Sequence, residues 1–183
     1  TIGRQSLQKI SFKERRKHCG VVMQEGFIFG DTIANNIVPD GNMIDKKRLL
    51  YAVEMANIRD FVESLPLKYN TKIGNTGQGL SQGQKQRILI ARAIYRNPDY
   101  LFFDEATNAL DTDNEKVIQG NLEKFFKDKT VVIVAHRLST VKNADQIVVL
   151  KEGEITEKGT HDELITRQGD YYRLVKNQLE LSA

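Results

Sequence analysis

Two adjacent carboxylates follow an apolar run in the middle of the chain. Tyr100–Phe103 is typical of a buried strand, and Asp104 and Glu105 come directly after it. Parallel α/β sheets bind their ligands at the carboxyl ends of the strands. Because successive side chains of a strand point to opposite faces, the two acids can do different chemistry. One suits Mg²⁺, held partly through water, and the other suits orienting or deprotonating an attacking water. Acids also end strands for purely structural reasons, so the pair alone decides nothing.

A second polar group opens a strongly predicted helix, which runs from Ser81 to Arg96. Ser81 can cap this helix, with Gln84 as its capping-box partner. Gly83 allows another backbone to approach closely. A helix N-terminus exposes N–H groups and a positive dipole end, which suit a phosphate. Taken in isolation, these residues are better explained as a helix cap after a flexible loop.

The composition is that of an ordinary globular domain. The chain has 183 residues, of which 40% are apolar, and 27 basic against 24 acidic residues give a net charge of +3. The basic residues are scattered, so no nucleic-acid patch is indicated. The single cysteine, Cys19, excludes an internal disulfide framework, fits a reducing compartment and is expected to lie buried in a strand. No apolar run approaches the ~18 residues of a membrane-spanning helix.

Continuous apolar strands alternate with helices along most of the chain. This alternation predicts an α/β fold in which a parallel sheet is covered on both faces. We expect residues 25–44 to form a loop, because glycine and proline recur there. The predicted strands are 20–23, 100–103, 130–135, 147–150 and 154–156, and the main predicted helices are 45–65, 81–96, 113–127, 138–142, 161–167 and 170–179.

The order and spacing of these motifs resemble the ATPase domain of ABC transporters, over nearly the whole chain. Each polar group has a counterpart in that family. The signature motif is similar to Leu80–Gln84, Walker B to Tyr100–Asp104, the catalytic glutamate to Glu105, the D-loop to Asn108–Asp111, the switch histidine to His136 and the Q-loop glutamine to Gln24.

The resemblance implies ATP and Mg²⁺ as cofactors and assigns four residues to the hydrolytic chemistry. Glu105 would polarise the attacking water, and His136 would contact the γ-phosphate. Asp104 and Gln24 would lie at Mg²⁺, and Gln24 could also contact the water. A lone histidine or a glutamine ending a strand would mean little without the other motifs.

The resemblance also implies two protein partners. Ser81, Gly83 and Gln84 would contact the γ-phosphate of a nucleotide held by a second ATPase domain, arranged head to tail. Asp111 would help to align this dimer. The other partner would be a transmembrane domain, which would hold the chain at the cytoplasmic face of a membrane, the bacterial inner membrane in our interpretation. No nucleic-acid partner is expected.

The implied fold is a P-loop NTPase-like parallel sheet with a helical subdomain that carries the signature motif. The helical subdomain would span roughly residues 38–97, and the core sheet roughly 18–24 and 98–158, followed by C-terminal helices over 160–180. Residues 26–37 and 153–164 resemble exporters. The sequence of residues 21–29 resembles that of bacteriocin-secreting peptide exporters that carry a peptidase domain.

The printed sequence departs from the family in three places. It contains no Gly-Lys dipeptide and therefore no G-x-x-x-x-G-K-[ST] loop, which in the family precedes the Q-loop. We therefore expect an N-terminally truncated domain in which this loop, Walker A, lies upstream of Thr1, and expect residues 1–183 alone to be inactive and only marginally stable. Gln82 replaces the usual signature glycine, and Asn75 stands where such exporters often have glutamate.

Two other functions remain open from the sequence. The chain could be a non-catalytic module that acts through dimerisation or as a structural half. It could also belong to a soluble ABC ATPase of DNA repair or translation, although those relatives usually carry coiled coils or extra basic domains.

Overall fold

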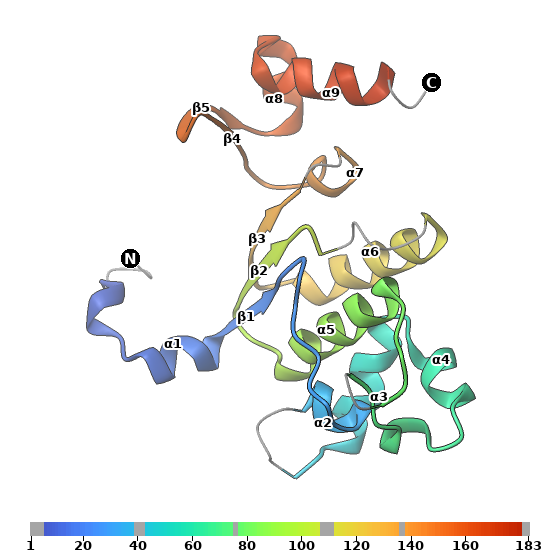
Figure 1. Cartoon of the computed structure of the whole chain (residues 1–183). Coiled ribbons are helices and arrows are strands. Elements are labelled where there is room, and N and C mark those ends of the chain that lie inside the picture. The colour runs from blue at the N-terminus through green and yellow to red at the C-terminus, as the bar shows by residue number, and fades with distance from the viewer. Residues whose placement is uncertain (1–5, 39–42, 75–76, 107–111, 136–137, 181–183) are drawn as a thin grey trace. The chain divides into compact units, whose positions relative to one another are not determined.

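The computed structural model describes residues 6–38, 43–74, 77–106, 112–135 and 138–180, and these form two compact units (Figure 1). Unit 1 comprises residues 1–134 and unit 2 residues 135–183. The predicted site residues Asp111 and His136, and also Asn75, lie outside the described residues.

Unit 1 is organised around a three-stranded parallel sheet of order β1-β2-β3 (Figure 1). The strands are β1 (Cys19–Val22), β2 (Tyr100–Asp104) and β3 (Thr130–Val134). Val22 pairs with Phe103, and Asp104 pairs with Val134, so the carboxyl ends of all three strands lie along one edge. The predicted parallel sheet is confirmed, and each of its strands lies within about one residue of the expected position.

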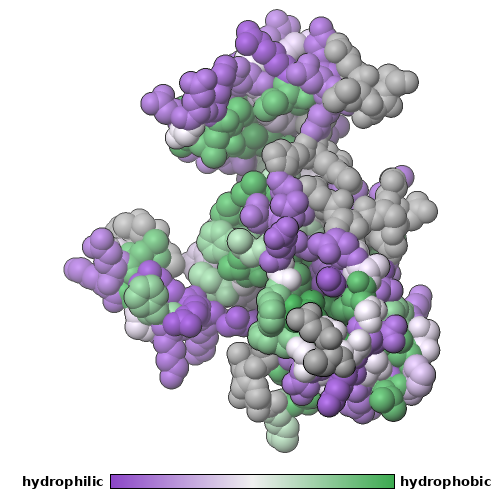
Figure 2. Space-filling model, in the orientation of Figure 1, coloured by the Kyte–Doolittle hydropathy of each residue, from purple (hydrophilic) through white to green (hydrophobic). Residues whose placement is uncertain are grey.

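The two faces of this sheet differ in burial. Leu101 and Phe103 are almost fully buried, whereas Phe102, which lies between them, is 41% exposed and Val132 is 48% exposed. Figure 2 shows hydrophobic surface over these strands. The prediction that both faces are covered is therefore wrong for this sheet. Cys19 begins β1 as expected but is only partly buried, because burial alternates along the strand.

Helices supply most of the core of unit 1. Helix α5 packs against β1 and ends at Asn97, whose left-handed φ of 47° closes the helix. Buried side chains of α5 meet those of α2, α3, α6 and the sheet in one cluster. The helical elements are η1 (Leu7–Lys9), α1 (Phe12–His18), α2 (Ile33–Ile37), α3 (Lys46–Met55), α4 (Arg59–Ser64), η2 (Lys68–Asn70), α5 (Gln82–Arg96) and α6 (Thr112–Phe126).

Helix α2 corrects the prediction of a loop over residues 25–44. The Thr32 side chain accepts a hydrogen bond from Asn35 N–H and so caps the helix. Ile33 and Ile37 are completely buried. A single turn between glycines and a proline has no periodic signal of its own, so its tertiary contacts decide that it is helical.

Unit 2 has its own small core. Strands β4 (Ile147–Lys151) and β5 (Glu154–Gly159) form an antiparallel hairpin. Its buried side chains pack with Leu164, Tyr171 and Val175. The helices are α7 (Leu138–Val141), α8 (His161–Arg167) and α9 (Asp170–Glu180), close to the predicted ranges.

Candidate functional site

The predicted metal and catalytic carboxylates lie at the carboxyl edge of the unit 1 sheet. Asp104 is the last residue of β2, and Glu105 follows it. Gln24 follows the end of β1 by two residues, within a turn, and is exposed. Because β1 and β2 are parallel and adjacent, Gln24 and the two acids emerge at the same edge.

Glu105 has an unusual backbone conformation. Its φ is 49°, in the left-handed region, which costs a residue with a Cβ roughly 1 kcal/mol or more. Its N–H donates to the Val134 carbonyl at 3.0 Å, which anchors it to the end of β3. The chain therefore leaves β2 abruptly at the predicted catalytic residue. Such strain is frequent at functional sites.

The polar group at the start of α5 forms the predicted capping box. Ser81 Oγ accepts a hydrogen bond from Gln84 N–H at 3.2 Å, and Gln84 Oε1 accepts one from Ser81 N–H at 2.9 Å. The fold brings this end of α5 to the carboxyl edge, because a helix that precedes a parallel strand runs back across the sheet. Gly83 lies in the first turn, partly buried.

A shallow pocket of about 280 Å³ joins the turn after β1 to the start of α5. Its walls include Gln24 and Phe27 from the turn, and Gln82 and Lys85 from the helix. Gly26 lets the backbone of the turn pack closely against α5, because a Cβ at this position would lie only 2.3 Å from a methyl carbon of Leu89. The structure thus brings predicted site residue Gln24 close to the signature-like segment, 57 positions away in sequence (81 − 24).

Gln86 is a positioning residue that the sequence prediction missed. Its side chain is only 2% exposed, and Nε2 donates to the Met23 carbonyl at 3.3 Å. This bond fixes the backbone immediately before Gln24. The available signal was a glutamine four residues before Ile90, on the apolar face of α5.

Arg92 is a second residue that the sequence prediction missed. Its Nε donates to the Asn36 carbonyl at 2.7 Å and its Nη1 to the Phe27 carbonyl at 3.0 Å. The guanidinium also lies 5.1 Å from the ring centroid of Phe29. Burial lowers the pKa of Arg92, although arginine remains charged at any ordinary pH. Arg92 therefore holds the segment after Gln24 against α5.

Asn36 fixes the same segment from inside. It is completely buried, its Oδ1 accepts from Phe29 N–H at 2.8 Å, and its Nδ2 donates to the Phe29 carbonyl at 3.0 Å. Asp31 precedes the cap of α2. Hydrogen bonds from Thr32 N–H and then from the Asn35 side chain lower the pKa of the Asp31 carboxyl.

The donor set at the carboxyl edge fits Mg²⁺ that arrives with a phosphate ligand. Asp104 and Gln24 carry oxygen donors, which Mg²⁺ prefers. Within the described ranges, no group of three or more His, Cys, Asp or Glu side chains is arranged to cage a metal. Mg²⁺ is usually bound by one or two protein ligands together with water and substrate phosphates, and such a site would fit this coordination.

The fold and this edge place the chain in a known family. A family described as ABC transporter matches residues 1–108. The structure of a bacterial Atm1-family ABC exporter with ATP bound is similar, with a TM-score of 0.90 and 36% identity, over 96% of this chain and 31% of that one. The chain belongs to the ABC transporter family, is of the exporter type, and has the α/β fold of its nucleotide-binding domains.

Two curated relatives extend this similarity. ATP-binding cassette sub-family B member 5 of Mus musculus is 46% identical over 97% of this chain. The ATP-dependent lipid A-core flippase of Syntrophus aciditrophicus is 43% identical over 95%. The chain spans only 14% and 29% of the lengths of these relatives. No helix in the described part of the chain is long and apolar enough to cross a bilayer.

Proposed function

We propose that this chain is part of the motor domain of an exporter, which binds and hydrolyses ATP to power transport across a membrane. The observation that carries the proposal is the carboxyl edge of unit 1, where Glu105 is anchored in a left-handed conformation directly after Asp104. Membership of the ABC transporter family supports the same reaction. The alternatives, a non-catalytic module or a soluble ABC ATPase, are less favoured because the similar proteins include exporters.

The proposed chemistry assigns separate roles to the residues at this edge. Glu105 orients or deprotonates the water that attacks the γ-phosphate. Asp104 and Gln24 hold Mg²⁺, which neutralises phosphate charge when it is bound. His136, outside the described residues, contacts the γ-phosphate.

The proposed active assembly contains two such domains arranged head to tail. Ser81, Gly83 and Gln84 approach a nucleotide held by the opposite domain, and the positive end of α5 favours its phosphate. Asp111 aligns the two domains. A transmembrane domain is the other partner and holds the motor at the cytoplasmic face of the membrane, and no nucleic acid is bound. Within the chain, we propose three parts: a helical subdomain over residues 38–97, a core sheet over 18–24 and 98–158, and C-terminal helices over 160–180.

The cargo is proposed from two sources that differ. The sequence of residues 21–29 favours a peptide as the cargo, since it resembles exporters of the bacteriocin-secreting kind. The name of one relative, the lipid A-core flippase, favours a lipid. Stimulation of ATP hydrolysis by a peptide, and not by lipid, in the intact transporter would support the peptide.

The proposal is tested by phosphate release from the intact protein that carries this chain. Glu105→Gln should bind ATP and lose turnover, whereas unchanged turnover would remove Glu105 from the mechanism. Calorimetry on residues 1–183 alone tests whether these residues bind Mg-ATP by themselves. No detectable binding would support the expectation that they are inactive alone, and tight binding would mean that a phosphate site exists within these residues.

A further inference from the structure

A second pocket lies in unit 1, at the amino ends of the strands. Its volume is about 330 Å³, and its walls come from α3, the end of α5, the end of α6 and the turn before β3. Asn97, which ends α5 shortly before β2, and Lys129, which directly precedes β3, both line it. The carboxyl edge that carries Asp104 and Glu105 is therefore at the opposite ends of the same strands.

The walls of this basic pocket carry four positive charges. The charged lining residues are Arg48, Lys124, Lys127 and Lys129, and no acidic residue lines the pocket in the part of the chain that the structure describes. Asp128 lies between two of these lysines in sequence but is exposed and not part of the lining. Four like charges around one concavity repel one another, and a bound anion would relieve this repulsion.

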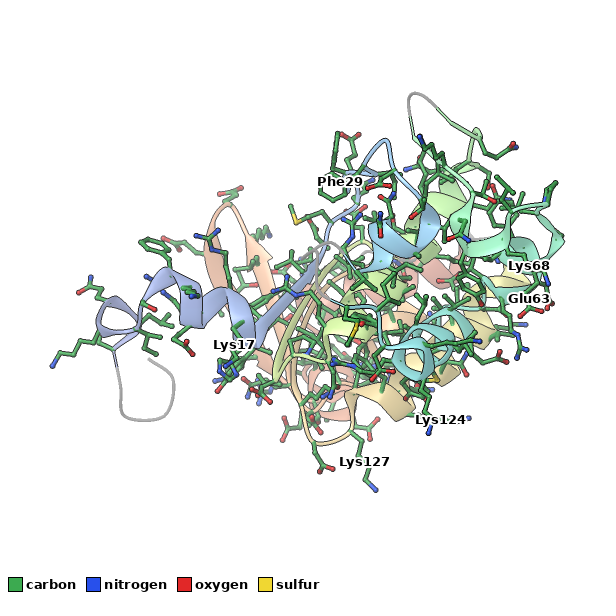
Figure 3. All side chains as sticks on the ribbon, turned by 90° about the horizontal axis from the view of Figure 1, so that it is seen from below. Lys17, Phe29, Glu63, Lys68, Lys124 and Lys127 are labelled. Atoms are coloured by element: carbon green, nitrogen blue, oxygen red, sulfur yellow. The ribbon has the colours of Figure 1, made fainter. Side chains whose placement is uncertain are left out.

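Two of the four cations are held in place by aromatic side chains. The Arg48 guanidinium lies 5.0 Å from the ring centroid of Tyr95 and donates from Nη2 to the Tyr95 carbonyl. Lys129 Nζ lies 5.1 Å from the ring centroid of Phe125. These contacts pre-organise part of the charge, which lowers the entropy lost when a ligand binds. Lys124 and Lys127 are exposed and extend on the same side of unit 1 (Figure 3).

A simpler explanation is that these cations interact with the negative, C-terminal ends of helix dipoles. Lys124 lies in the last turn of α6, where a positive charge is favourable. Arg48, however, lies in the first turn of α3, where the helix dipole disfavours a cation. Its bond to Tyr95 caps one carbonyl at the end of α5, but one capping bond does not require three further cations nearby.

The geometry points to this basic pocket as a binding site for a small, multiply charged phosphate ligand. Its volume is at the lower end of ligand sites, which span roughly 300–1,000 Å³, so it fits a pyrophosphate-sized group. Lysine and arginine side chains form strong, charge-assisted hydrogen bonds to phosphate oxygens. The ligand could be a free phosphorylated molecule or the phosphate headgroup of a lipid. This site goes beyond the proposed ATP site, since it shares no residue with it.

The test is calorimetric titration of the full 183-residue chain with inorganic pyrophosphate. The pocket variant is Lys124→Gln with Lys127→Gln, and the matched control is Lys17→Gln with Lys68→Gln. Both pairs remove two exposed lysine charges, and Figure 3 shows the control lysines away from Lys124 and Lys127. Circular dichroism and thermal unfolding establish that each variant is folded.

We expect the pocket variant to bind pyrophosphate about tenfold more weakly or worse, since it loses two charged contacts at an exposed site. The control should bind as the unmodified chain does. Equal binding by all three proteins would place pyrophosphate elsewhere and overturn the proposal, as would no binding to the unmodified chain. Equal weakening in both variants would reduce the effect to net charge and also overturn it.

A second arm distinguishes the two sources of phosphate. Phosphatidylcholine vesicles with and without phosphatidic acid are sedimented with each protein. Retention that needs phosphatidic acid, is lost in the pocket variant and is displaced by pyrophosphate would identify a lipid headgroup. Pyrophosphate binding without such retention would identify a free ligand.

Discussion

The two edges of the unit 1 sheet carry opposite chemistry. At the carboxyl ends of the strands, Asp104 and Glu105 end β2 at the same edge as the turn that carries Gln24. At the amino ends, four cations surround the basic pocket. The parallel arrangement contributes to this contrast, because it gathers helix N-termini at one edge and helix C-termini at the other. Acids therefore lie at the edge where a helix N-terminus favours phosphate, and this combination suits a phosphate bound to a metal ion rather than a bare phosphate.

The largest expected effect is on turnover at the carboxyl edge. Glu105→Gln in the intact protein should lower phosphate release by about 10²–10⁴-fold, since it removes a general base. ATP binding should persist, because the side chain keeps its size. Glu152→Gln is a matched control, since Glu152 also has a left-handed φ, of 52°, but lies in the β4–β5 turn. If both variants keep full turnover, Glu105 has no catalytic role, and the proposal that the carboxyl edge is the catalytic edge fails.

The next largest effect concerns the contacts that hold the segment after Gln24. Arg92→Met should lower the free energy of unfolding by about 2–3 kcal/mol, because two carbonyls lose charged donors. Urea unfolding measures the change. Arg167→Met is the control, since the exposed Arg167 donates to one carbonyl, that of Lys158. Equal losses in both variants would show that the segment depends little on Arg92.

A smaller loss is expected from Gln86→Leu. This change removes the partly buried hydrogen bond from Gln86 to the Met23 carbonyl, which should cost about 1 kcal/mol. Amide hydrogen exchange should also become faster in residues 23–27, next to the predicted ligand Gln24. Gln119→Leu serves for comparison, because Gln119 donates to Glu115 on its own helix. Unchanged exchange in residues 23–27 would contradict the positioning role of Gln86.

The smallest effect is a dependence of stability on pH at Asp31. Hydrogen bonds lower the pKa of Asp31 from its ordinary value of 3.8, so the stabilisation is complete above pH 3.8. It is lost as the pH falls through the lower, folded value. Thermal unfolding should therefore separate the unmodified chain from Asp31→Asn at neutral pH and bring them together in strong acid. A gap that persists in strong acid, or that Asp128→Asn reproduces, would be evidence against this linkage.

The basic pocket offers the opposite test of the contrast between edges. Because Lys124 and Lys127 belong to the amino edge, replacing both with glutamine should leave ATP turnover unchanged. Loss of turnover comparable to that of Glu105→Gln would mean that the two edges do not act separately.

The sequence by itself determined the strands, most helices and the Ser81–Gln84 capping box. These features depend on local causes: apolar runs, helix periodicity, and hydrogen bonds between residues three apart. The order of the polar motifs was also enough to predict the family. The roles of Glu105, Asp104 and Gln24 remain predictions, as do those of Asp111 and His136, which lie outside the described residues.

Only the tertiary structure decided the rest. Helix α2 is a single turn whose buried isoleucines, not its local signal, make it helical. One face of the sheet is exposed, which the apolar strands did not predict. The bond from Gln86 to Met23 and the contacts of Arg92 join segments that are far apart in sequence. The basic pocket likewise gathers cations from positions 48 to 129. Sequence periodicity reports which side of one element is apolar, but it does not report which other element that side will meet.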